Sequence, residues 1–149
     1  MAIRQATRQD IPALLELLAS YASENPIACL RDKNNHDVEY IKNLLFSIIS
    51  GRGFILVDDK YNGFLIAFIS SNVWAPKVKE LKELAWWVKP ECRNGILGGR
   101  LWKQFDNLAE QMLVDKRIDF VCSSITGNGS FVDYTKRDYK VLDATFYRD

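Results

Sequence analysis

Apolar residues recur at two different spacings along the 149-residue chain, and the change between them predicts where helices and strands lie. A spacing of three to four residues over residues 11–21 and 38–48 predicts two amphipathic helices, and the same spacing over residues 96–113 predicts the longest helix. Asp10 and Asp37 stand where the first two helices need an N-cap. Gly51 is expected to end the second helix, and a further short helix is expected over residues 130–137.

Shorter apolar runs predict strands over residues 3–6, 54–58, 64–70, 79–88, 120–124 and 141–147. Asn62-Gly63, between the second and third runs, is typical of a hairpin turn. The run Ala-Trp-Trp-Val at the end of the fourth strand is apolar on both faces, as expected in the middle of a covered sheet. The order of elements predicts one α/β (α+β) domain over residues 1–149, with a central, mostly antiparallel mixed sheet of about six strands flanked by helices.

The composition excludes several classes of protein. Hydrophobic residues at 48% and charged residues at 26% are usual for a globular domain and argue against disorder. A formal net charge of +1 supplies no long-range field for nucleic acid or for a membrane surface, so neither is expected as a partner. Arg4, Arg8 and Asp10 lie where a signal peptide would be apolar, so a cytoplasmic location is expected.

The cysteines and the single histidine indicate no metal site. Cys29, Cys92 and Cys122 are odd in number and widely spaced, which matches neither a disulfide framework nor paired zinc ligands. His36 lies in a polar run without a second imidazole and is interpreted as a loop residue. Its distance in sequence from every candidate nucleophile also leaves hydrolase chemistry with little support.

The segment KPECRNGILGG places Gly95, Gly98 and Gly99 between a predicted strand and the longest helix. The first amides of a helix have no internal partner, so such a turn can hold a phosphate or pyrophosphate through backbone alone. Close packing of the helix against the sheet explains the glycines equally well. Neither the P-loop motif nor the dinucleotide-binding motif is present.

The longer segment WWVKPECRNGILGGRL resembles the acetyl-CoA-binding signature of the GNAT superfamily of N-acetyltransferases. The opening IRQATRQDIPALLELL is similar to the first strand and helix of that family, and VDYTKRDYKVLDATFY resembles its closing segment. The Ala-Trp-Trp-Val run and the glycine turn are closer to small GNAT proteins of bacteriophages, which would place the protein in a host cytoplasm. The resemblance implies a GNAT-like acyl-CoA N-acyltransferase fold, in which two splayed strands leave room for the cofactor.

The resemblance also implies the reaction, which is transfer of an acetyl group from acetyl-CoA to a primary amine by direct attack. The pyrophosphate is expected at the backbone amides of residues 93–98, and the pantetheine beside the fourth strand. The cofactor-binding residues implied are Trp87, Val88, Arg93, Asn94, Gly95, Ile96, Leu97, Gly98, Gly99 and Asn128. Trp86 and Trp87 should point to opposite faces of the sheet, so at least one of them is expected in the core.

This sequence departs from the family pattern at two positions. Ile96 stands where the signature has its first glycine, and a branched side chain facing the pyrophosphate would crowd it. Gly95 can substitute if the turn shifts by one residue. Asp138 stands where the closing segment usually has a glycine, a mild change because aspartate tolerates a left-handed helix stop.

Tyr134 matches the acid tyrosine of the family, since a phenol is protonated at neutral pH and can donate to a departing thiolate. A buried helix aromatic is the alternative interpretation. Glu83 is the candidate base, because burial within the fourth strand would raise its pKa; an ordinary strand-edge carboxylate is nearly as good an interpretation. Glu80, among Lys77, Lys79 and Lys82, is expected on a solvated face.

The expected partner is an amine-bearing acceptor, either a small molecule or a protein, and a homodimer stays open. The acceptor site is expected in residues 25–37 and 73–79, where nearby lysines would repel a polycation such as a polyamine. The alternative function is a noncatalytic binding or interaction module that kept the fold while its altered glycine signature lost the cofactor.

Overall fold

The computed structural model describes residues 2–125 and 132–149. Along the chain the elements are β1 (Ile3–Gln5), η1 (Arg8–Asp10), α1 (Ile11–Ser23), α2 (Ala28–Arg31), η2 (Lys33–Asn35), α3 (Val38–Ser47), η3 (Ile48–Arg52), β2 (Gly53–Asp58), β3 (Gly63–Ser71), β4 (Lys79–Val88), η4 (Pro90–Cys92), α4 (Leu97–Val114), β5 (Phe120–Cys122) and η5 (Tyr134–Arg137). The three long helices and the first five strands therefore occur where the hydrophobic spacing predicts them.

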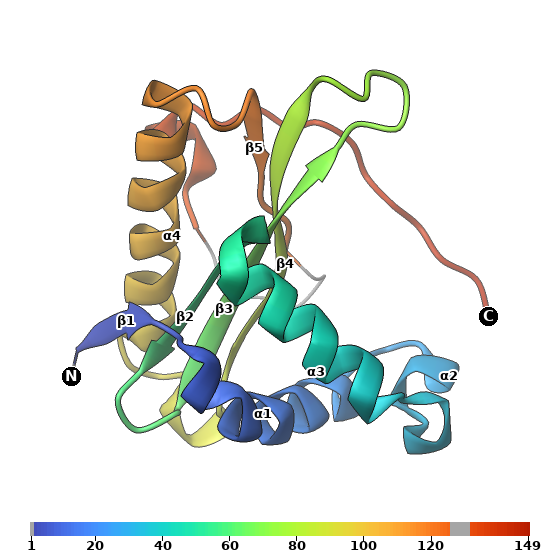
Figure 1. Cartoon of the computed structure of the whole chain (residues 1–149). Coiled ribbons are helices and arrows are strands. Elements are labelled where there is room, and N and C mark those ends of the chain that lie inside the picture. Colours follow the sequence, from blue (N-terminus) through green and yellow to red (C-terminus); the bar gives the residue numbers. More distant parts are fainter. Residues whose placement is uncertain (1, 126–131) are drawn as a thin grey trace.

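The strands form one mixed sheet in the order β1-β2-β3-β4-β5. The first four strands are antiparallel neighbours, and only β4 and β5 run parallel (Figure 1). The prediction of an α+β domain with a mostly antiparallel sheet is confirmed. The connections follow the sequence order, so each strand packs beside the strand that precedes it in the chain.

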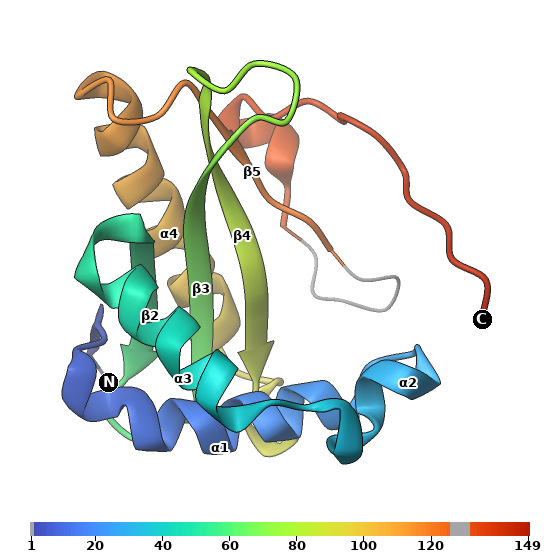
Figure 2. The same cartoon turned by 45° about the vertical axis from the view of Figure 1, so that its right-hand side comes forward.

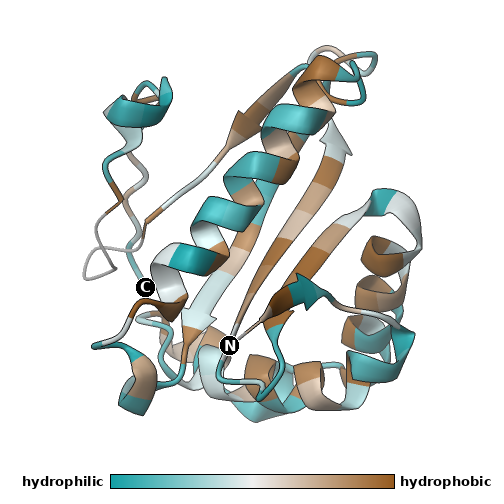
Figure 3. Ribbon diagram, turned by 90° about the vertical axis from the view of Figure 1, so that its left-hand side faces the viewer, coloured by the Kyte–Doolittle hydropathy of each residue, from teal (hydrophilic) through white to brown (hydrophobic). Residues whose placement is uncertain are grey.

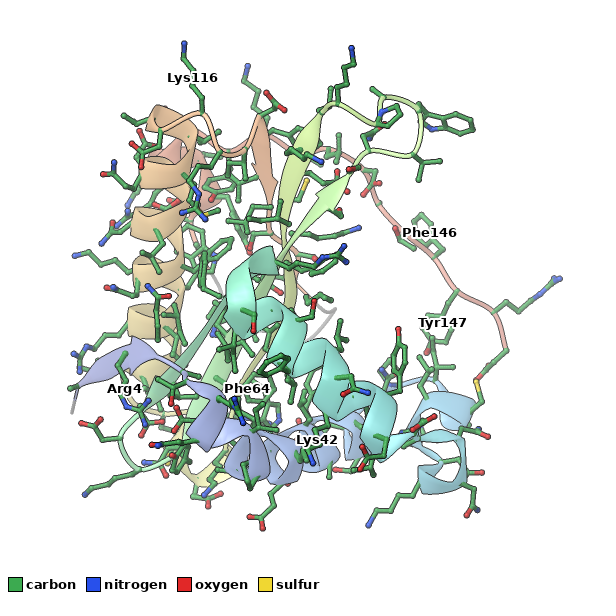
Figure 4. All side chains as sticks on the ribbon, viewed as in Figure 1. Arg4, Lys42, Phe64, Lys116, Phe146 and Tyr147 are labelled. Atoms are coloured by element: carbon green, nitrogen blue, oxygen red, sulfur yellow. The ribbon has the colours of Figure 1, made fainter. Side chains whose placement is uncertain are left out.

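The predicted sixth strand over residues 141–147 is wrong. After η5 the chain runs away from the sheet without regular structure (Figure 2). Val141 and Phe146 are 94% and 90% exposed, and Phe146 and Tyr147 project from this segment (Figure 4). Alternating apolar residues form a strand only where a neighbouring strand supplies hydrogen bonds and a face to bury, and here neither is present in the described chain. Of the short helix predicted over residues 130–137, the described part is η5.

Helices cover the two faces of the sheet. α4 lies on one face, where Leu101, Phe105 and Ala109 pack against strand residues such as Leu56 and Leu65 (Figure 3). α1 and α3 lie on the other face (Figure 1). There Leu14 and Leu45 pack in one core cluster with the strand residues Ile55, Val57, Phe64 and Ile66. The amphipathic patterns of the helices thus each bury their apolar stripe against the same sheet.

The caps and turns differ in detail from the sequence-based expectations. Asp37 caps α3 as predicted, accepting from the Tyr40 amide at 3.0 Å. Asp10 does not cap α1; instead its buried carboxylate accepts two hydrogen bonds from Arg4 at 2.8 Å each. β2 and β3 form the predicted hairpin, but Asn62-Gly63 is not itself the turn, because Gly63 already belongs to β3. The buried carboxylate of Asp58 accepts hydrogen bonds from the amides of both Asn62 and Gly63.

A bulge in β4 changes which face its side chains occupy. Ala67 of β3 pairs with Glu83 and Ile66 pairs with Ala85, which leaves Leu84 without a partner in the ladder. Before the bulge the odd-numbered Leu81 packs with the α4 face, whereas after it Ala85 packs with the α1 and α3 face. The extra residue therefore shifts the alternation of the strand by one position.

β4 and β5 stay together for only a short distance. They pair from Glu80↔Phe120 to Lys82↔Cys122, while β4 continues to Val88. In the described chain no strand pairs with this edge of β4 from Glu83 onward. The separation of β4 from β5 is the splaying of two strands that the resemblance to acetyltransferases implies.

Candidate active site

Glu83 lies at the point where β4 and β5 separate, and it is 7% exposed. Its Oε1 accepts a hydrogen bond of 3.0 Å from the hydroxyl of Ser123, which directly follows β5. Burial raises the pKa of Glu83 to about 7, because the charged form loses its hydration, although the Ser123 hydroxyl and the Ser124 amide partly favour that form. A carboxylate that changes protonation near neutral pH suits acid and base chemistry.

Tyr134 lies on the other side of Ser123. Its hydroxyl is 3.0 Å from Ser123 Oγ, and the indole Nε1 of Trp102 donates to the same Oγ at 3.1 Å. Glu83 and Tyr134, the two residues predicted to be base and acid, are therefore joined by one serine. Burial is the main reason that the pKa of Tyr134 is raised, so its hydroxyl holds its proton at neutral pH.

Aromatic contacts hold the tyrosine in place. The Tyr134 ring meets Trp102 and Tyr139 edge to face, with centroids 5.4 and 5.5 Å apart. Asp106 of α4 accepts from the Tyr139 hydroxyl at 2.9 Å and from Arg137 at 2.7 Å, which fastens η5 to the helix. Asp138 ends η5 with φ 64°, the left-handed stop that the sequence led us to expect there.

The predicted anion site lies at the N-terminus of α4. The helical ladder opens with the Arg100 amide donating to the Ile96 carbonyl at 3.0 Å, so the amides of Leu97, Gly98 and Gly99 come before it. Ile96 occupies the N-cap position, where an alkyl side chain offers no acceptor. An anion bound here would satisfy these amides and meet the positive end of an 18-residue helix.

Packing against the described residues does not require the glycines of this turn. An added Cβ at Gly98 would lie 3.6 Å from Val88, an ordinary contact, and at Gly99 it would meet nothing within 4 Å. Gly95 would lie 3.6 Å from the Cys92 carbonyl, and the left-handed backbone angles of the described glycines occur elsewhere. Packing against the described residues therefore does not account for these glycines, and the close approach of a ligand stays a prediction.

Arg93 anchors the turn rather than pointing freely outward. Its Nε donates to the Val88 carbonyl at 2.8 Å, and its guanidinium forms an ion pair of 2.6 Å with Glu24 at the end of α1. Glu24 also accepts from Trp87 Nε1 at 3.2 Å, and the guanidinium lies over the Trp87 ring. The amides of Arg93 and Gly95 already donate within the turn, to Pro90 and Cys92, at 3.3 and 3.4 Å.

The two tryptophans pack on opposite faces of the sheet. Trp87 is buried with Phe64 on the α1 side, whereas Trp86 and Val88 pack toward α4. The side chains at the end of β4 on the α4 face are thus Trp86 and Val88, and the Trp87 side chain is on the other face. Of the other residues predicted to bind the cofactor, Leu97 is a buried core residue, Asn94, Gly95 and Ile96 are exposed, and Asn128 lies outside the described residues.

Several residues of this site were not predicted from the sequence. They are Ser123, Trp102 and Glu24, whose hydrogen-bond partners are distant in the chain. Ser123 is 40 residues from Glu83, and Trp102 is 21 residues from Ser123. Glu24 is 63 residues from Trp87 and 69 from Arg93. A polar pair directly after the fifth strand, Ser123-Ser124, is the one local feature that could have pointed to Ser123. Glu80 accepts from Ser70 at 3.2 Å and is partly exposed, in line with its expected solvated position.

The segments expected to form the acceptor site carry exposed apolar side chains. Trp74 and Val73, between β3 and β4, are 91% and 84% exposed, and Leu30 of α2 is half exposed. His36 contacts the Leu30 carbonyl at 2.8 Å within its loop. Over the described residues no helix is long and apolar enough to cross a membrane, and no three potential metal-ligating side chains cluster.

No protein-family model and no curated protein matches the chain. Among solved structures, a possible acetyltransferase from Clostridium difficile 630 is similar over 99% of this chain and 95% of its own, with a TM-score of 0.66 and 15% identity. An aminoglycoside acetyltransferase from an uncultured soil metagenomic sample covers 99% and 95%, with a TM-score of 0.61 and 16% identity. A ribosomal-protein-alanine N-acetyltransferase from Brucella melitensis biovar Abortus 2308 covers 100% and 99%, with a TM-score of 0.60 and 15% identity.

These likenesses extend over nearly the whole chain, and the chain has the fold of GNAT acetyltransferases. At such low identity they show the fold and leave the activity of this chain to its own residues. They give no support to the narrower likeness to bacteriophage proteins.

Proposed function

We propose that the protein is an acetyl-CoA-dependent N-acetyltransferase that acts on a primary amine. The observation that carries the proposal is the Glu83–Ser123–Tyr134 group, which lies where β4 loses its neighbour on the sheet. A carboxylate that titrates near pH 7 and a protonated phenol are the two groups that amine acylation requires.

The residues of the site fit the parts of acetyl-CoA. The amides of Leu97, Gly98 and Gly99 would hold the pyrophosphate, and the edge of β4 beside Trp86 and Val88, which pairs with no strand among the described residues, would bind the amides of the pantetheine. Acetyl-CoA supplies the acetyl group as an activated thioester. Ile96 is 74% exposed, so its side chain leaves the helix end rather than filling it.

The roles of the two titratable groups follow from their environments. Glu83 removes a proton from the attacking amine, directly or through a water, and Tyr134 gives a proton to the departing sulfur. Glu83 is ionised above pH 7 and therefore acts as a base where many amines are still partly protonated. The Arg93–Glu24 ion pair holds the turn, and with it the helix end, in register with β4.

Binding and turnover are tested together on the purified chain. Acetyl-CoA at 100 times its Kd should add about 2.7 kcal/mol of stability, which corresponds to several degrees of Tm. Release of free CoA is then followed with a panel of amines that includes an aminoglycoside and a peptide with N-terminal alanine, since proteins of this fold act on such acceptors. No thermal shift at millimolar acetyl-CoA would favour the noncatalytic module instead.

Two variants separate catalysis from retention of the cofactor. Tyr134→Phe keeps the ring that packs on Trp102, so we expect unchanged acetyl-CoA affinity and a turnover lower by roughly 10²-fold. Glu83→Gln should lose turnover at neutral pH and recover part of it at a pH where the amine deprotonates unaided. Full turnover in the Tyr134→Phe protein with a verified acceptor would remove Tyr134 from the mechanism.

A further inference from the structure

Ser123 is the member of the Glu83–Ser123–Tyr134 group to which the proposed function gives no task. Its Oγ lies 3.0 Å from Glu83, 3.0 Å from Tyr134 and 3.1 Å from Trp102 Nε1. These partners come from β4, η5 and α4, and Ser123 follows β5. A serine hydroxyl has one hydrogen to donate and two lone pairs to accept with, so three partners use its capacity in full.

The chemistry of the partners determines the direction of each hydrogen bond. The indole N–H of Trp102 only donates, and an ionised Glu83 only accepts. The Ser123 hydrogen therefore points to Glu83, and both lone pairs of Ser123 accept, one from Trp102 and one from the Tyr134 hydroxyl. While Glu83 is charged, the Tyr134 proton is directed at Ser123 and is turned away from any other acceptor.

Protonation of Glu83 allows the chain of donors to reverse. The carboxylic acid then donates to Ser123, and the Ser123 hydrogen turns to the Tyr134 oxygen. The Trp102 bond to Ser123 is kept in both arrangements, so the serine oxygen stays in place. Tyr134 accepts from Ser123 in this second arrangement, and its own proton is released to point elsewhere.

We propose that Ser123 is a proton relay that couples Glu83 to Tyr134, so that Tyr134 offers its proton to the departing sulfur only after Glu83 has taken one from the amine. The proposal rests on the proposed acetyl transfer. The N–H bond of the amine breaks as an O–H bond forms on Glu83, and the C–N bond forms as the C–S bond breaks. The Tyr134 O–H bond breaks as an S–H bond forms, and the protons of Glu83 and Ser123 each move one position to restore the phenol.

The surroundings of Glu83 keep the proton within this group. Among the described residues, Tyr21 of α1 and Tyr134 interact electrostatically with Glu83, and both hold their protons at neutral pH, since burial raises the pKa of each above its ordinary value. No cation forms an ion pair with Glu83 among the described residues. A relay that returns the amine proton to the sulfur needs no exchange with solvent during the transfer.

The test is a double-mutant cycle on the full chain with acetyl-CoA and an acceptor found in the amine panel. Ser123→Ala alone should lower kcat by roughly 10²-fold while leaving the Kd for acetyl-CoA unchanged. In the Tyr134→Phe background, measured at a pH above the acidic limb where Glu83 is ionised in all variants, the same change should have no further effect, because the relay has lost its end. Ser123→Thr, which keeps the hydroxyl, should have the turnover of the wild type. If the alanine variant does not fold, Ser123→Cys replaces it as the variant without a hydroxyl, and its turnover is compared with that of Ser123→Thr.

The pH profile supplies a reading that a purely structural serine would not change. Because the Ser123 hydroxyl favours the ionised form of Glu83, its loss should move the acidic limb of kcat/KM to higher pH. Ser70→Ala is the matched control, since Ser70 donates to Glu80 at 3.2 Å in the same sheet without a tyrosine, and it should keep wild-type turnover.

The relay is overturned if Ser123→Ala keeps turnover within about twofold of the wild type. It is equally overturned if the loss in Ser123→Ala is repeated in full on top of Tyr134→Phe, because independent effects add. A wild-type chain that binds acetyl-CoA but releases no CoA with any amine overturns the proposed function itself. An active wild type with an equally active Ser123→Ala variant overturns the relay alone, so the two failures are distinguishable.

Discussion

Replacement of Gly99 by alanine should change stability and ligand binding in opposite directions. Gly99 lies in the first turn of α4, its backbone is helical, and an added Cβ would meet no atom within 4 Å. Alanine in place of glycine in a helix stabilises by about 0.5 to 1 kcal/mol, because the unfolded chain loses less backbone freedom on folding. For a domain of this size, 1 kcal/mol raises the Tm by about 2 to 4 °C.

The same methyl should weaken acetyl-CoA binding. Cα–Cβ bonds in a helix tilt toward its N-terminus, so the new methyl would lie over the amides that are expected to hold the pyrophosphate. A tenfold loss of affinity corresponds to about 1.4 kcal/mol. At a ligand concentration of 100 times the wild-type Kd, the stabilisation by acetyl-CoA should therefore fall from about 2.7 to about 1.4 kcal/mol.

Thermal unfolding with and without acetyl-CoA measures both effects in one experiment. Gly51→Ala is the control, because Gly51 also has open space around it but has φ 136°, a conformation that alanine rarely adopts. We expect the control to lower the ligand-free Tm and to leave the shift by acetyl-CoA unchanged. A Gly99→Ala protein with a raised Tm and an undiminished ligand shift would refute the interpretation of the turn as a pyrophosphate site.

Two further predictions concern buried carboxylates. The pKa of Glu83 is raised in the folded state to about 7, so the stabilising contribution of Glu83 is present below pH 4.5 and is lost as the pH rises toward 7. The difference in the free energy of unfolding between the wild type and Glu83→Gln should therefore change by about 2 to 3 kcal/mol between pH 5 and 8, as measured by urea titration. Arg4 lowers the pKa of Asp10 well below its usual range, so Asp10 stabilises the fold above about pH 4. Asp10→Asn should lower the stability by about 2 kcal/mol at pH 7 and by about 1 kcal/mol less at pH 3, where the carboxylate is still ionised in the folded chain, and equal losses at both pH values would show that charge is not involved.

The hydrophobic periods by themselves determined most of the secondary structure. The spacing of apolar residues in α1, α3 and α4, and the runs in β2 to β4, specify elements whose buried faces need no distant partner to be recognised. The segment over residues 141–147 is also rich in apolar and β-branched residues and is not a strand, because a strand also needs a neighbour with free backbone groups. Pattern alone carries no information on that neighbour.

The sequence also indicated which titratable residues to consider, but only the tertiary structure decided how they act together. Glu83 was favoured over Glu80 because of its apolar surroundings, and burial of Glu83 agrees with that argument. Its orientation depends on the bulge at Leu84, which places Glu83 on the α4 face while Trp87 turns to the other face. A bulge arises from the pairing of two strands, so neither strand specifies it alone.

Ser123 shows the same limit most clearly. A serine after a strand has no distinctive chemistry in the sequence alone, and it becomes a link between Glu83 and Tyr134 only where β4, β5, α4 and η5 meet. Long-range contacts of this kind depend on the packing of whole elements, and hydrogen-bond direction follows from the set of partners that packing supplies. The sequence by itself determined the elements and the candidate acid and base, and the tertiary structure decided which side chain joins them.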